Sequence, residues 1–258
     1  MKRLFTFHGA DHKVGTTMLA QSVAELITSS YREVRVLLVS LHGGPGSEYV
    51  DRAGESVENL RAYLENRVLS KKELLKACRR SENFYMLAGV ENLLETREYF
   101  PAMVEYLLET VEEEFQIVVA DSGNEIDNGL AAGALQLSRD NFLVLSQRET
   151  ALSRWERLRP IYKQLGLEFS AFIMNHFQEQ DPYSQDYVCR RLDIGPEQLI
   201  KVAAADHGRL AEMERKSLLS YRNEKYTEGV TEVANRILAG CALPEIEKQR
   251  KGRWRNFI

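Results

Sequence analysis

A short apolar segment near the start of the chain runs into a glycine-flanked loop, and that loop opens a helical pattern. The segment reads LFTFH over residues 4–8, and the loop reads GADHKVG over residues 9–15. Apolar residues then recur at helical spacing, at Leu19, Ala20, Val23, Ala24 and Ile27. A strand, a tight loop and a helix in this order form the frame of a phosphate-binding loop, whose backbone N–H groups surround phosphate oxygens. This feature predicts an α/β fold with a nucleotide phosphate at the loop.

The loop departs from the ordinary pattern G-x-x-x-x-G-K-[ST] at its charged position. In that pattern a lysine reaches the β- and γ-phosphate oxygens, and the following hydroxyl binds magnesium. Thr16 stands where the lysine is expected, and Thr17 keeps the hydroxyl. Lys13 lies inside the loop and can swing towards a phosphate, but its Cβ crowds a turn that needs close backbone approach. Two alternatives therefore stay open, a cation supplied by Lys13 and a loop without one.

The same stretch resembles the deviant phosphate loop of the ParA/MinD ATPases, GKGGVGKTTLA. Residues 10–20 align with it without a gap and are identical at Val14, Gly15, Thr17, Leu19 and Ala20. In that family the first lysine crosses an ATP-bound dimer to the partner's phosphate, and the second binds phosphate within its own subunit. Asp11 and Thr16 occupy these two positions here, and neither side chain can supply a cation.

Two strand ends resemble further landmarks of the family, in the same order. Residues 36–46, VLLVSLHGGPG, are similar to the family's VLLVDLDPQG, with Ser40 and His42 in place of both aspartates. The GGPG stretch is either a mobile turn or a remodelled ligand loop. Residues 115–123, FQIVVADSG, resemble the Walker B strand and keep Asp121, which reaches magnesium through water in the family. An acid after an apolar strand also caps turns and helices, so that structural role is the alternative for Asp121.

Similarity to the family continues into the second half of the chain. Residues 141–152 are similar to a family strand and the helix start that follows it. Residues 172–177, FIMNHF, resemble a strand end whose asparagine contacts the adenine base, and Asn175 holds that position. Asparagine is also a common turn residue at the end of a strand. The resemblance therefore makes Asn175 the candidate for base recognition, with a turn role as the alternative.

Together these landmarks imply a site for ATP or ADP with magnesium. The implied nucleotide contacts are Lys13, Gly15, Thr16, Thr17 and Asn175. Magnesium is implied at Thr17 and Asp121, and Asp121 is also the candidate catalytic residue. His8, His12 and His42 follow two neighbouring strands, but their irregular spacing is more typical of core and turn residues than of a metal site.

Apolar, β-branched runs alternate with longer helical patterns along most of the chain, which favours a mostly parallel sheet covered on both faces. We expect strands over residues 4–8, 34–39, 84–87, 116–120, 141–145, 169–174 and 199–202. We expect further helices over residues 57–65, 71–79, 100–113, 151–165 and 226–238. The predicted fold is an α/β P-loop domain over residues 1–244, with about seven strands in a twisted sheet and a tail over residues 245–258.

Composition excludes several other classes of protein. A chain of 258 residues with 44% hydrophobic content can bury one large core. Its net charge of −4 argues against a surface coated for nucleic acid, and no specific nucleic-acid partner is expected. The three cysteines lie far apart, as in a reduced cytoplasmic protein. No stretch approaches the roughly 18 apolar residues of a membrane span.

The C-terminal tail carries a separate signal. Residues 248–258, KQRKGRWRNFI, contain five basic residues, no acidic ones and three large apolar ones. Such a segment suits an anionic bilayer, which would give peripheral contact with the inner face of a membrane. A solvated tail and an anchor for a protein partner are the alternatives.

Within the family the chain resembles the TadZ/CpaE branch of pilus-assembly proteins, whose members often have atypical phosphate loops. The resemblance implies a homodimer and a protein partner in a localisation, pilus or secretion assembly. Because both lysines and both acids are replaced, we expect a positioning scaffold deficient in hydrolysis. The alternative is an active ATPase whose site is rebuilt around Lys13, Thr17 and Asp121.

Overall fold

Seven parallel strands form one sheet in the computed structural model, which describes residues 1–51, 54–92 and 94–247. The strand order is β3–β2–β4–β1–β5–β6–β7, and every neighbouring pair is parallel. The strands are β1 (Leu4–Gly9), β2 (Val36–Ser40), β3 (Phe84–Leu87), β4 (Ile117–Asp121), β5 (Asp140–Ser146), β6 (Ala171–Phe177) and β7 (Leu199–Ala203). The predicted fold class is therefore confirmed.

The helices are α1 (Thr16–Ser30), α2 (Val57–Glu65), α3 (Lys71–Cys78), α4 (Pro101–Val111), α5 (Gly129–Leu137), α6 (Glu149–Gln164), α7 (Gln185–Leu192), α8 (Gly208–Glu214) and α9 (Glu224–Gly240). Helices α1 to α7 lie between successive strands, and α8 and α9 follow β7. The five helices predicted after the phosphate loop are confirmed as α2, α3, α4, α6 and α9. The short helices α5, α7 and α8 were not predicted.

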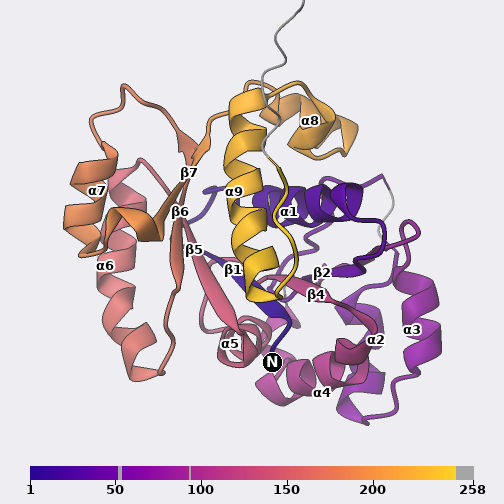
Figure 1. Cartoon of the computed structure of the whole chain (residues 1–258). Helices are drawn as coiled ribbons and strands as arrows, with labels where there is room; N and C mark the ends of the chain where they lie inside the picture. The colour runs from indigo at the N-terminus through magenta and orange to yellow at the C-terminus, as the bar shows by residue number, and fades with distance from the viewer. Residues whose placement is uncertain (52–53, 93, 248–258) are drawn as a thin grey trace, which may run out of the picture.

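The helices cover both faces of the sheet, as Figure 1 shows. On one face α1, α8 and α9 pack over a core that includes Phe5, Phe7 and Leu38. On the other face α2 to α5 pack over Leu37 and its neighbours, and α6 and α7 cover the β5 to β7 side. Successive strand residues alternate between the faces, because side chains of a strand point to opposite sides. Continuous apolar runs are therefore buried on both sides, as parallel sheets require.

A buried asparagine closes the end of α1. Asn83, the residue before β3, donates through Nδ2 to the carbonyl oxygens of Thr28, Tyr31 and Val34 at 3.0, 2.9 and 3.2 Å. The last carbonyls of a helix have no partner within the helix. Asn83 thus provides a donor to one carbonyl in the last turn of α1 and to two carbonyls of the turn that leads to β2.

The described part of the C-terminal tail lies against the domain. Ile246 N donates to Asn235 Oδ1 at 2.7 Å, and Asn235 Nδ2 donates to Ile246 O at 3.2 Å. Tyr31 OH contacts the carbonyl oxygens of Pro244 and Glu245 at 3.1 and 2.9 Å. Residues 243–247 therefore run back along α9 (Figure 1). The basic segment 248–258, predicted to contact a membrane, lies outside the described residues.

Among the helices that the structure describes, none has both the length and the apolar character needed to cross a membrane.

Candidate nucleotide site

The loop over residues 9–15 joins β1 to α1 at the carboxyl edge of the sheet. Gly9 N donates to Gly123 O at 2.6 Å, and Ala10 N donates to Val144 O at 2.7 Å, so both neighbouring strands hold the loop. Lys13 has a φ of 58°, in the left-handed region that glycine favours. This backbone explains why the resembling loop has glycine at that position.

The start of α1 presents uncapped backbone N–H groups. Gly15 is the N-cap residue, with a φ of 83°, and no side chain caps the helix. Thr16 is buried, and its hydroxyl lies so close to Gly9 that a Cβ there would come within 2.7 Å of Thr16 Oγ1. Lys13 is exposed. The loop thus keeps backbone donors for an anion, while the lysine position holds a small, buried hydroxyl.

Three groups converge on the Asp121 carboxylate at the end of β4. Thr17 Oγ1 donates to Asp121 Oδ2 at 2.6 Å, and Gly123 N donates to Asp121 Oδ1 at 3.0 Å. His42 Nε2 lies 3.4 Å from Asp121 Oδ2, a buried contact that is an ion pair when the ring is protonated. The structure therefore brings together Thr17 and Asp121, the two residues implied as a magnesium pair, and adds His42 to them.

His42 and Asp121 stabilise each other's charged forms. Burial by itself would raise the pKa of Asp121, but the adjacent His42, the Thr17 hydroxyl and the Gly123 N–H hold that pKa below its ordinary value. Burial would lower the pKa of His42, but the Asp121 carboxylate raises it above 6.5. Asp121 is 1% exposed, and the His42 ring lies beside it.

Asn175 lies beneath the loop. Its Nδ2 donates to Val14 O at 2.8 Å, and the residue is only 3% exposed. A Cβ at Gly15 would come within 2.5 Å of Asn175 Nδ2, so glycine is needed there for this close approach as well as for its φ. Within the described residues Asn175 Oδ1 has no hydrogen-bond partner. Contact with an adenine base stays a prediction, and support of the loop is what the geometry provides.

His8 is enclosed within the core on the α6 side of β1. Its Nδ1 lies 2.9 Å from Ser122 Oγ, and its Nε2 lies 2.7 Å from Tyr162 OH. Ser122 Oγ donates its one hydrogen to Phe7 O, so His8 Nδ1 must donate to Ser122 and Nε2 must accept from Tyr162. Burial lowers the pKa of His8 to about 4, and the ring is neutral near pH 7.

The other two histidines differ from His8 in their surroundings. His12 lies at the surface with Nε2 3.3 Å from Glu125 Oε1, whereas His42 faces Asp121. Of the residues that the structure describes, no group of three or more histidine, cysteine or acidic side chains is placed to hold a metal ion.

Arg154 on α6 was not predicted and reaches the loop from another part of the chain. Its Nη1 donates to Ala10 O at 3.3 Å, and its Nη2 donates to Asn124 O at 2.9 Å and to Glu125 Oε1 at 3.0 Å. Arg154 Nη1 also lies 4.0 Å from Asp11 Oδ1. Asp11 therefore has a cationic partner within its own chain.

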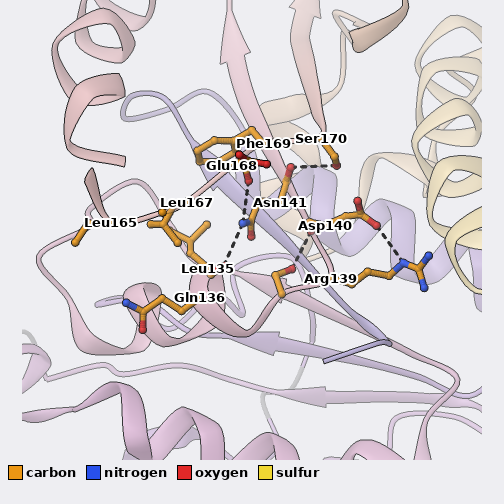
Figure 2. Close-up of a pocket in the computed structure, with 12 residues that line it drawn as sticks. Leu135, Gln136, Arg139, Asp140, Asn141, Leu165, Leu167, Glu168, Phe169 and Ser170 are labelled. Atoms are coloured by element: carbon orange, nitrogen blue, oxygen red, sulfur yellow. Dashed lines mark hydrogen bonds and ion pairs between the residues drawn. The ribbon is translucent and has the colours of Figure 1, made fainter. Parts of the chain in front are cut away.

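A cavity of about 480 Å³ opens beside this cluster, lined in part by His12, His42, Gly123 and Asn128. A second cavity, of about 400 Å³, lies at the opposite edge of the sheet. Figure 2 shows it around Asn141, whose Nδ2 donates to the carbonyl oxygens of Leu135 and Glu168, both at 3.1 Å. Ligands of open α/β sheets bind at the carboxyl ends of the strands, so we assign the candidate site to the loop edge.

No family model matches the sequence, and no curated protein matches it either. Solved structures do match the fold. A ParA family ATPase from Chlorobium tepidum has a TM-score of 0.78 at 16% identity, with 91% of this chain and 99% of that chain covered. The septum site-determining protein MinD from Pyrococcus horikoshii, complexed with Mg-ADP, has a TM-score of 0.74 at 16% identity over 93% and 98%. An ATP complex of Cyanothece McdA has a TM-score of 0.73 at 10% identity over 95% and 98%. The chain therefore has the fold of the ParA/MinD ATPases.

Proposed function

We propose that this chain is a degenerate ParA/MinD-type protein that acts as a spatial-positioning or assembly scaffold and does not hydrolyse ATP at a useful rate. Similar folds include a MinC:MinD cell division complex from Aquifex aeolicus, at a TM-score of 0.69, and a putative plasmid partition protein from Borrelia burgdorferi bound to AMPPNP, at 0.65. The proposed setting is a homodimer in the cytoplasm that serves a pilus or secretion assembly of the TadZ/CpaE kind.

The missing phosphate cation carries this proposal. Thr16 stands at the lysine position, and its buried hydroxyl cannot replace an ammonium group. Arg154 lies near the loop, but its donors go to Ala10 O, Asn124 O and Glu125. Phosphoryl transfer depends on positive groups that stabilise charge developing on the phosphate, and removal of one such donor costs about 10²–10³ in rate. We therefore expect ATP turnover at background.

Nucleotide binding is proposed to persist in a weaker form. The uncapped start of α1 supports it, because N–H groups at a helix start bind phosphate without any side-chain charge. The proposed phosphate contacts are Gly15, Thr16 and Thr17, with Lys13 at the rim. Asn175 Oδ1, which has no partner in the described part of the chain, is the proposed acceptor for the base.

The test restores the missing cation. We expect Thr16→Lys to tighten ATP binding about 10- to 100-fold in calorimetric titration, the range of a charge-assisted hydrogen bond. Thr16→Gln is the matched control, since it adds length without charge and should not tighten binding. Unchanged affinity in Thr16→Lys would mean that the loop has closed into a structural turn.

A turnover assay separates the scaffold from the alternative ATPase. The Thr17–Asp121 contact of 2.6 Å is the observation that favours an active site rebuilt around Lys13, Thr17 and Asp121. Steady phosphate release from the unaltered chain, abolished by both Lys13→Ala and Asp121→Ala, would establish that alternative and overturn the proposal.

A further inference from the structure

Magnesium in a site of this kind needs oxygen ligands in near-octahedral geometry. Thr17 Oγ1 and the Asp121 carboxylate are suitable oxygens, and they lie side by side. The resemblance leads one to expect two further acids here, and Ser40 and His42 stand in their places. Binding of magnesium therefore depends on the groups that surround Asp121.

Two glycines, Gly44 and Gly123, pack closely against the side chain of His42, and we call this pair the glycine seat. A Cβ at Gly44 would come within 2.9 Å of His42 Cε1, and a Cβ at Gly123 would come within 2.9 Å of His42 Cβ. Any other residue at these two positions would therefore press on the histidine side chain. The seat holds His42 Nε2 3.4 Å from Asp121 Oδ2, the oxygen that also accepts from Thr17.

Residues 43–46, which include Gly44, are held by hydrogen bonds from the residues after β3. Gly89 N donates to Pro45 O at 2.7 Å, and Val90 N donates to Gly44 O at 3.1 Å, so the residues after β3 hold the segment after β2. Gly46, with a φ of 62°, packs so closely on Ser40 that a Cβ would fall 1.8 Å from Ser40 Oγ. The GGPG stretch is therefore a shaped support rather than an unattached turn.

Both oxygens of the Asp121 carboxylate already face protein groups. Oδ1 accepts from Gly123 N, and Oδ2 accepts from Thr17 and faces His42. A nitrogen that faces Asp121 replaces the oxygen ligand that the ion would need. Among the described residues, no group of three or more histidine, cysteine or acidic side chains is placed to hold a metal ion, so further acids do not replace those missing at Ser40 and His42.

We propose that His42 takes the place of the magnesium ion beside Asp121, so that the site binds a di- or triphosphate anion free of metal. The inference rests on the proposed nucleotide site and adds its cofactor requirement. His42 acts as a positioning residue: it holds Asp121 where a metal would otherwise hold it, and leaves the backbone donors of α1 to receive the phosphate.

The test uses the full chain near neutral pH, with Mn²⁺ and ADP as probes. We expect ADP affinity in magnesium and in EDTA to agree within about twofold, the range of small electrostatic differences. Electron paramagnetic resonance should detect no protein-bound Mn²⁺, with or without ADP. His42→Asp, which supplies an oxygen ligand, should bind Mn²⁺ in the presence of ADP. Addition of the ion should then raise the midpoint temperature of thermal unfolding of this variant.

Matched variants keep the result interpretable. His12→Asp adds the same charge at a nearby exposed position and should gain no Mn²⁺ site. His42→Asn, similar in shape and without a carboxylate, shows whether the seat tolerates substitution and should also stay metal-free. Failure of His42→Asp to gain Mn²⁺ while it remains folded would overturn the inference.

Two outcomes separate this inference from the proposed function. ADP affinity that rises tenfold or more with magnesium, with no turnover of ATP, would overturn metal-free binding and leave the scaffold proposal intact. Absence of ADP binding under both conditions would overturn the inference and the proposed nucleotide site together. Mn²⁺ bound to the unaltered chain and lost in Asp121→Asn would likewise overturn the inference alone.

Discussion

Protonation of His8 should weaken the fold in mild acid, because both ring nitrogens already have partners. Nδ1 donates to Ser122, and Nε2 must stay unprotonated to accept from Tyr162 OH at 2.7 Å. A proton on Nε2 would place two donors against each other and put a charge into a fully buried site. The perturbation is a change of pH, and His8→Gln, which cannot titrate, isolates this residue.

The magnitude follows from the pKa difference between the folded and unfolded chain. The folded pKa of His8 is lowered to about 4, and the unfolded ring titrates at its ordinary 6.5. Between these values the unfolded chain binds a proton that the folded chain does not, so the free energy of unfolding falls as pH decreases through this window. The full loss is about 3 kcal/mol, of which about 2 kcal/mol is present at about pH 5.

Urea unfolding followed by tryptophan fluorescence measures the effect, since Trp155 is buried and stacks on Tyr162. The quantity compared is the change in unfolding free energy between about pH 7.5 and about pH 5. His8→Gln should lose about 2 kcal/mol less than the unaltered chain on acidification. His12→Gln, at an exposed histidine of the same loop region, should behave like the unaltered chain. An equal loss in His8→Gln and the unaltered chain would refute the reasoning.

Three further predictions concern assembly, the tail and the loop. Because Asp11 faces Arg154 of its own chain rather than a partner's phosphate, the mass measured by light scattering should not change with ATP; a monomer that dimerises only with ATP would contradict this. Deletion of residues 248–258 should abolish weak, salt-sensitive sedimentation with anionic vesicles, and Trp254→Ala should reduce it; equal pelleting of the full and truncated chains would exclude a membrane role. Gly15→Ala should lower the free energy of unfolding by about 2 kcal/mol or more, because of its φ and its contact with Asn175. Gly208→Ala, with open space around it, should not destabilise the chain. Equal unfolding free energies for the Gly15→Ala and Gly208→Ala variants would refute the assigned backbone constraint.

Periodicity predicted the sheet well because its strands are nearly continuous apolar runs buried on both faces. The helix α5 was missed for the opposite reason. Its sequence, GLAAGALQL, contains two glycines that weaken helix propensity, and the structure shows why they are present: Gly129 lies against the Tyr99 carbonyl and Gly133 against Val104 of α4. Close packing of α4 on α5 favours this helix, and a local pattern cannot report such a contact.

The site was predictable only where its residues belong to the motifs that carry the family resemblance. Thr17 and Asp121 were paired in advance through the resemblance, and their contact is observed. Arg154 and Tyr162 reach residues far earlier in the chain, Ala10 and His8, and nothing in their own neighbourhood marks them. The sequence shows His42 in place of an expected acid. The packing of glycines that directs its side chain towards Asp121 appears only in the folded structure.

The hydrogen bonds of Asn83 couple opening of the sheet edge to the phosphate helix. β3 is an edge strand, and release of Asn83, the residue before it, would withdraw this donor from three carbonyl oxygens at and after the end of α1. A buried carbonyl without a donor costs about 1–3 kcal/mol, so opening of the edge destabilises the end of the helix. The two segments therefore form one cooperative unit, whose amide hydrogens should exchange with solvent together. A partner that pairs with or displaces the edge strand would in this way act on the helix whose other end forms the phosphate loop.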